Sequence, residues 1–214
     1  MRTVLSILAV VGVLSARADA LPVCPQAWDY SPFDATAEDG AIAVRSGACV
    51  LSTCIDGAFS DSFEYVAEVT PTDVSPARGW SHLGIACLED DRNFWCLSLV
   101  QAPTSQGGRR FVELSEMREG FWGSQGKDGL TRSDGGLRGC GWEVGRTYRL
   151  KLSVDAEGVR GEVCEKDGKP LWRDGYRFDG PAVRGGRPGF RCEGGLAGRL
   201  AGTALMSNAG VLAL

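Results

Sequence analysis

The sequence is a succession of short apolar runs separated by turn-forming residues. Val, Leu, Phe and Tyr dominate the runs, and Gly, Asp or Pro bounds them, which is typical of β-strands joined by tight turns. No stretch repeats apolar residues at helical spacing, and thirty glycines among 214 residues are about twice the usual share. We therefore expect an all-β fold, an antiparallel β-sandwich or jelly roll. The runs span residues 41–44, 48–54, 62–70, 82–88, 93–100, 109–117, 147–155, 159–168 and 186–194.

The first twenty residues have the pattern of a secretory signal peptide. Arg2 precedes an apolar run at 4–14, and Ala18-Asp19-Ala20 supplies a small-residue cleavage site. We expect cleavage near Ala20 and export to the periplasm or the extracellular space. The mature chain would then be one domain, residues 21–208, with a short tail at 209–214.

No later apolar run reaches the roughly 18 residues that a membrane-spanning helix needs. The chain is acidic, with a formal charge of −4 that becomes −5 once the signal is removed. Its basic residues are scattered rather than gathered in a stripe. This distribution argues against nucleic acid and against anionic membrane surfaces as partners.

Eight cysteines all follow the signal, and an even number in an exported chain favours disulfides over free thiols. A metal site is disfavoured, because there is no C-x-x-C pair and His82 is the only histidine. We interpret His82 as a surface or edge residue. No cofactor is expected. The cysteines are residues 24, 49, 54, 87, 96, 140, 164 and 192.

The stretch GIACLEDDRNFWCLSLV, residues 84–100, predicts a β-hairpin. If residues 90–93 form a four-residue turn, Cys87 lies directly opposite Cys96. Their Cβ atoms would be about 4.5–5.5 Å apart, near disulfide distance. This register predicts a Cys87–Cys96 disulfide and points His82 away from Cys87, whereas a five-residue turn would break the pairing.

Residues 117–145 differ from the rest, being mostly Gly, Asp, Ser and Arg with isolated Trp122 and Trp142. A long loop in a compact domain is usually functional or disordered. Trp80 and Trp122 stand in turn-like surroundings and are candidates for a stacking surface. Trp95, Trp142 and Trp172 are interpreted as packing residues.

The hairpin also carries a family resemblance. Gly84-Ile85-Ala86-Cys87, a turn at 89–93 and Phe94-Trp95-Cys96-Leu97 resemble the G-I-x-F … D-x-x-N-[FY]-[YW]-x-L hairpin of secreted concanavalin A-like domains. More narrowly, they resemble the bacterial domain named for 3-keto-disaccharide hydrolase, related in fold to family 16 glycoside hydrolases. Segments that begin at residues 40, 62, 147 and 186 resemble further strands of that domain in order. The resemblance implies a concanavalin A-like jelly roll.

The resemblance does not extend to a complete set of catalytic residues. Family 16 hydrolases carry Glu-x-Asp-x-x-Glu on one strand, and the nearest match is Glu113-Leu114-Ser115-Glu116. Ser115 replaces the Asp, and Glu116 would face away from Glu113 because strand side chains alternate. Glu113 is thus a weak catalytic candidate.

The predicted function is a secreted carbohydrate- or glycan-binding module without catalysis. Its ligand-binding candidates are Trp80 and Trp122 for stacking, and Arg110 and Glu113 for hydroxyl groups. One alternative is a glycoside hydrolase of the keto-disaccharide or family 16 type with Glu113 as the acid, which a second carboxylate within about 10 Å would favour. Another is a structural or adhesion domain. The pattern Asp90-Asp91-Arg92-Asn93 indicates a turn, with structural calcium as an unsupported alternative.

Overall fold

A computed structural model describes residues 34–53, 61–76, 79–123, 130–134 and 141–207, and almost all regular structure in them is β. A single 3-10 turn, η2 (Thr104–Gln106), accompanies the strands. The strands are β1 (Ala35–Glu38), β2 (Ala41–Val44), β3 (Cys49–Thr53), β4 (Phe63–Val74), β5 (Ser81–Leu88), β6 (Phe94–Gln101), β7 (Arg110–Arg118), β8 (Phe121–Trp122), β9 (Leu130–Asp134), β10 (Tyr148–Val154), β11 (Gly158–Glu165), β12 (Pro170–Phe178), β13 (Arg187–Glu193) and β14 (Leu196–Ser207).

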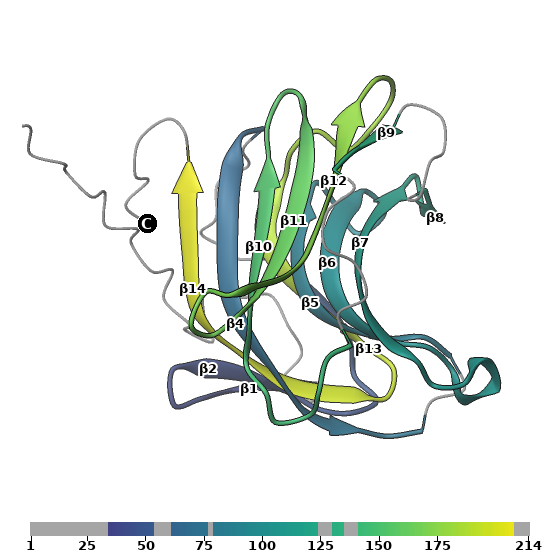
Figure 1. The fold of residues 1–214 in the computed structure, drawn as a ribbon, viewed down its shortest axis with the longest axis vertical. Coiled ribbons are helices and arrows are strands. Elements are labelled where there is room, and N and C mark those ends of the chain that lie inside the picture. The colour runs from purple at the N-terminus through teal and green to yellow at the C-terminus, as the bar shows by residue number, and fades with distance from the viewer. Residues whose placement is uncertain (1–33, 54–60, 77–78, 124–129, 135–140, 208–214) are drawn as a thin grey trace, which may run out of the picture.

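Two antiparallel sheets form a sandwich, as the sequence predicts (Figure 1). The eight-stranded sheet has the order β1-β2-β14-β4-β10-β11-β12-β9, and the six-stranded sheet has the order β3-β13-β5-β6-β7-β8. The core lies between them, and its largest buried side chains include Trp95, Tyr65, Tyr148 and Phe190. Alternation along the strands explains this packing, since every second residue of β10 is buried against the other sheet.

The expected strands all form where the structure describes them, and further strands appear beside them. β8 and β9 lie within residues 117–145, which the composition indicates to be a loop. β12 carries several charged residues and shows no clean apolar run. Trp95, Trp142 and Trp172 pack in the core, as expected.

The 84–100 hairpin forms, but its turn has five residues. Leu88 pairs with Phe94, so Cys87 lies opposite Trp95 and Cys96 opposite Ala86. The two thiols therefore point to opposite faces of the sheet, Cys87 into the main core and Cys96 into a smaller outer cluster. The predicted Cys87–Cys96 disulfide is wrong, because one extra turn residue shifts the pairing and reverses the face.

The turn owes its shape to Asp90. Its carboxylate accepts hydrogen bonds from the backbone N–H of Arg92 (2.8 Å) and the side-chain amide of Asn93 (2.9 Å). These bonds, that from Asn93 foremost, hold the pKa of Asp90 below its ordinary value. The expected role of these residues in turn formation is thus confirmed.

The five cysteines that the structure describes are free thiols: Cys49, Cys87, Cys96, Cys164 and Cys192. The expected signal peptide and tail, with Cys24, Cys54 and Cys140, lie outside the described residues. Within the described ranges, no helix is long and apolar enough to cross a membrane.

Candidate ligand-binding site

The outer face of the six-stranded sheet, which points away from the core, carries the candidate site. Because side chains alternate along a strand, the outward residues of four strands line up across the sheet. Arg191, Gly84, Ser98 and Glu113 form one such row. The adjacent row contains Glu193, His82, Val100 and Phe111.

These rows border a cavity of about 560 Å³, called here the outer-face pocket. Its size falls within the range of about 300–1,000 Å³ typical of small-molecule sites. Two large apolar side chains, Trp80 and Trp122, flank it, each 41% exposed. The lining residues are Gly79, Trp80, His82, Phe111, Glu113, Ser115, Trp122, Arg191 and Glu193.

The aromatic walls are held in place by ring contacts. Trp80 meets Phe111 edge to face, with ring centroids 5.9 Å apart. Trp122 meets Phe94 in the same way at 5.7 Å, and its ring lies nearly parallel to the imidazole of His82 at 6.3 Å. These contacts fix both indoles while leaving part of each exposed to the pocket.

Arg191 is the buried positive charge of the site, with 7% of its surface exposed. Its Nη2 donates a hydrogen bond to Oε2 of Glu193, and its Cζ lies 4.6 Å from the centre of the Trp122 ring. The other terminal nitrogen, Nη1, is buried and has no hydrogen-bond partner. The guanidinium of Arg191 thus lies within the wall of the pocket, packed against Trp122 and paired with Glu193.

His82 supplies a second unpartnered atom at the same place. The residue is 8% exposed, which corrects its expected place at the surface, and its Nδ1 has no hydrogen-bond partner. Burial, reinforced by the charge of Arg191, lowers the pKa of His82 from 6.5 to about 3. The imidazole is therefore neutral at neutral pH, with one nitrogen able to donate and the other to accept.

Gly84 allows β5 and β6 to approach closely beside the pocket. A Cβ atom at this position would lie 2.0 Å from the carbonyl oxygen of Leu97, a distance that no side chain tolerates. Beside it, the Cys96 thiol and the Ser98 hydroxyl share a hydrogen bond of 2.8 Å. Burial raises the pKa of Cys96 and the charge of Arg191 opposes this, so the thiol is a packing residue of the outer cluster rather than a nucleophile.

Three of the four candidates from the sequence meet in this pocket: Trp80, Glu113 and Trp122. Arg110 is not among its lining residues. Its guanidinium lies over the ring of Trp142 at 4.8 Å, and its Nε donates to Oε1 of Gln101 at 3.3 Å. Arg110 is three residues from Glu113, an odd step that places it on the opposite face of β7.

Sequence reasoning missed Arg191, Glu193 and the pocket position of His82. The available signal was the alternation Arg191-x-Glu193 within a strand, which puts both charges on one face. No local pattern, however, pairs that strand with β5, because more than ninety residues separate them along the chain.

Two carboxylates line the pocket, Glu113 from β7 and Glu193 from β13. Glu116 is not one of them, and the expectation that it faces away from Glu113 is confirmed. It is buried on the core side, where its Oε1 accepts a hydrogen bond from the backbone N–H of Val183 at 2.7 Å. Burial raises the pKa of Glu116.

Among the described residues, no group of three or more His, Cys, Asp or Glu side chains is placed to hold a metal ion. The chemistry of the pocket combines flat apolar walls with donors and acceptors at the floor.

No family model and no curated protein sequence matches the chain. Solved structures resemble its fold at low identity. The carbohydrate binding module CBM66 from Bacillus subtilis aligns at 12% identity and a TM-score of 0.58, over 85% of this chain and 96% of that one.

Two further structures have the same architecture. The VIP36 exoplasmic/lumenal domain, in a Ca²⁺/Man3GlcNAc-bound form, aligns at 12% identity and a TM-score of 0.51 over 85% of this chain and 84% of that one. The GH43 BlXynB protein from Bacillus licheniformis aligns at 12% identity and a TM-score of 0.60 over 88% of this chain but 38% of its own. The chain thus adopts the lectin-like jelly-roll β-sandwich fold.

Proposed function

We propose that this protein is a non-catalytic carbohydrate-binding module whose outer-face pocket binds a neutral sugar. The observation that carries the proposal is the placement of the polar side chains of His82, Glu113 and Arg191 in one pocket with two partly exposed tryptophans. Sugars present both features that such a site needs: apolar ring faces and hydroxyl groups.

Each side chain then has a definite task. Trp80 and Trp122 stack on the apolar faces of the sugar. The polar side chains of His82, Glu113 and Arg191 offer hydrogen bonds to the sugar hydroxyl groups.

The charges of the pocket favour a neutral sugar over an acidic one. Glu113 and Glu193 bring two negative charges against the single positive charge of Arg191, and His82 is neutral. Arg191 is already paired with Glu193. A uronic acid would therefore meet an excess of like charge, whereas hydroxyl groups can donate to both carboxylates.

The structural neighbours support this proposal. One is described as a carbohydrate binding module and another is bound to an oligosaccharide. We also propose that the protein acts outside the cytoplasm, on the basis of the signal-like residues 1–20. Glycans on surfaces or in the medium would be available to it there.

Hydrolysis of a glycosidic bond is the second candidate function. The presence of two carboxylates, Glu113 and Glu193, in one pocket favours it. The resemblance to the 3-keto-disaccharide hydrolase and family 16 domains points to the same reaction. Three strand intervals of about 4.8 Å put the backbones of β7 and β13 roughly 14 Å apart. This wide backbone spacing favours the larger distance between carboxyl groups found in inverting enzymes, about 6.5–9.5 Å, over the roughly 5–5.5 Å of retaining enzymes.

A glycan array with the purified mature chain tests both functions. Binding should be lost or weakened at least about tenfold, roughly 1.4 kcal/mol, in Trp122→Ala and Arg191→Met. Arg110→Gln, outside the pocket, is the matched control and should bind as the wild type. Release of reducing sugar by the wild type, abolished in Glu113→Gln, would assign the hydrolase instead. Binding to no glycan would leave the structural or adhesion role.

A further inference from the structure

We propose that the ligand is an oligosaccharide, which extends from the outer-face pocket past Trp80 into a second hollow. This inference rests on the proposed sugar-binding function and concerns the length of the ligand. A cavity of about 440 Å³ adjoins the pocket and shares three lining residues with it, Gly79, Trp80 and Glu193. The two cavities are therefore successive parts of one cleft.

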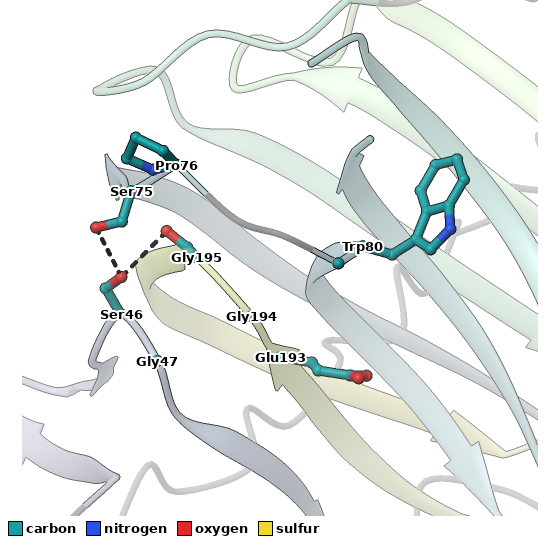
Figure 2. Close-up of a pocket in the computed structure, with 9 residues that line it drawn as sticks. Ser46, Gly47, Ser75, Pro76, Trp80, Glu193, Gly194 and Gly195 are labelled. Atoms are coloured by element: carbon teal, nitrogen blue, oxygen red, sulfur yellow. Dashed lines mark hydrogen bonds between the residues drawn. The ribbon is translucent and has the colours of Figure 1, made fainter. Parts of the chain in front are cut away.

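The second hollow has a different chemistry from the pocket. Besides the shared residues, it is lined by Ser46, Gly47, Ser75, Pro76, Gly194 and Gly195. Figure 2 shows the two serines at one end and the indole of Trp80 pointing away from them. Apart from Glu193 and the indole of Trp80, the lining residues are two serines, one proline and four glycines, none of them charged.

Two serines offer hydrogen bonds to a ligand in the hollow. Ser46 Oγ lies 3.0 Å from Ser75 Oγ and 3.1 Å from the carbonyl oxygen of Gly195. A hydroxyl has one proton, so Ser46 can serve only one of these acceptors at a time. The other acceptor is then available to a sugar hydroxyl.

The hollow is preformed rather than dependent on ligand. Backbone hydrogen bonds join its walls: Gly47 N–H to Gly194 oxygen at 2.8 Å and Ser75 N–H to Gly195 oxygen at 2.7 Å. Ser81 Oγ accepts from the N–H of Gly195 at 2.8 Å. Three distant chain segments are thus fixed around one space, which lowers the entropic cost of binding.

Gly194 lines the second hollow at a point where two chain segments pack closely. Its φ of +78° is in the left-handed region, and a Cβ there would lie 2.7 Å from the carbonyl oxygen of Trp80. Next to it, the carboxylate of Glu193 borders both cavities. It can accept hydroxyl groups from sugar units on both sides of the junction.

The length of the ligand follows from this arrangement. A single sugar unit occupies either the aromatic pocket or the serine-lined hollow, but it cannot fill both. A chain of two or more units occupies both, with Trp80 at the boundary. Affinity should therefore rise with the number of units until both cavities are filled.

Isothermal titration with xylo-, cello- and manno-oligosaccharides of one to six units tests the proposal. For the series that binds, affinity should rise at least about tenfold from one unit to four. Ser46→Trp fills the exposed end of the hollow and should abolish this gain, so that four units bind no more tightly than one. Ser46→Ala removes only the hydroxyl and should reduce the gain. Ala156→Trp, at an exposed turn of the other sheet, is the bulky control and should retain it.

Equal affinity for one and four units, or an unchanged gain in Ser46→Trp, would overturn the two-cavity ligand while leaving sugar binding intact. Binding of no sugar in any series, together with an empty glycan array, would overturn the proposed function and this inference with it.

Discussion

The two faces of the six-stranded sheet use the same residue types for different purposes. On the inner face, Trp95 is fully buried, its ring stacks on Tyr176 at 5.6 Å, and its Nε1 donates to the carbonyl oxygen of Val183 at 2.9 Å. On the outer face, Trp80 and Trp122 keep part of their surface exposed beside unpartnered polar atoms. The face of the strand, rather than the residue type, thus decides whether a tryptophan stabilises the fold or lines the site.

The largest expected effect is a difference in stability between tryptophan variants of the inner and outer faces. Trp95→Ala should lower the free energy of unfolding by about 3–5 kcal/mol, because it empties a packed core site. Trp122→Ala should lower it by less than about 1 kcal/mol, because a partly exposed side chain loses little packing. Denaturant unfolding followed by circular dichroism measures both changes. Similar losses in the two variants would contradict the division between faces.

A second prediction concerns the loss of stability of the folded protein at acidic pH. In the folded protein His82 has a pKa of about 3, against an ordinary value of 6.5. The unfolded chain therefore binds a proton between these values that the folded chain does not, so stability falls as the pH drops below about 6.5. Between about pH 8 and pH 5 the expected loss from this residue is about 2 kcal/mol.

His82→Gln provides the comparison for that measurement. Its unfolding free energy should fall less than that of the wild type over the same pH interval, by roughly the 2 kcal/mol assigned to the imidazole. Identical pH profiles would show that His82 titrates normally and lies less deeply buried than described.

The smallest expected effect tests the register of the hairpin. Cys87→Ala should cost about 1 kcal/mol, the value of a small buried group, with or without reductant. Loss of a native disulfide would cost about 2–5 kcal/mol, and only under oxidising conditions. Peptide mapping without reduction should find Cys87 and Cys96 alkylated after denaturation. A disulfide-linked Cys87–Cys96 peptide would instead support the register with a four-residue turn.

The sequence predicted the sandwich because alternation and turn residues act locally. The pairing register of the hairpin could not be predicted in this way, because it depends on the exact length of the turn. One additional residue in the turn before Phe94 places Cys96 on the face of the sheet opposite to Cys87. Arg110 and Glu113 lie on opposite faces of β7 for a similar reason, because an odd number of residues separates them.

Arg191 is the cation beside the carboxylates of the pocket, and only the pairing of β13 with β5 brings it there.

The pattern of β12 was obscured for another reason. Arg173, Asp174 and Arg177 interrupt its apolar residues, although Trp172 and Tyr176 face the core. Arg173 and Arg177 are exposed on the outer face of the sheet, whereas Asp174 is buried on the side that carries Trp172 and Tyr176. Tertiary context, rather than local pattern, therefore determines that this segment is a strand.

The position of β14 has a consequence for how the chain matures during synthesis. This strand, late in the sequence, pairs with β2 on one side and β4 on the other, inside the eight-stranded sheet. Until the ribosome has released it, β2 and β4 both present open edges, which other chains can join. A nascent molecule therefore remains open to pairing with other chains until β14 has been synthesised and has closed both edges.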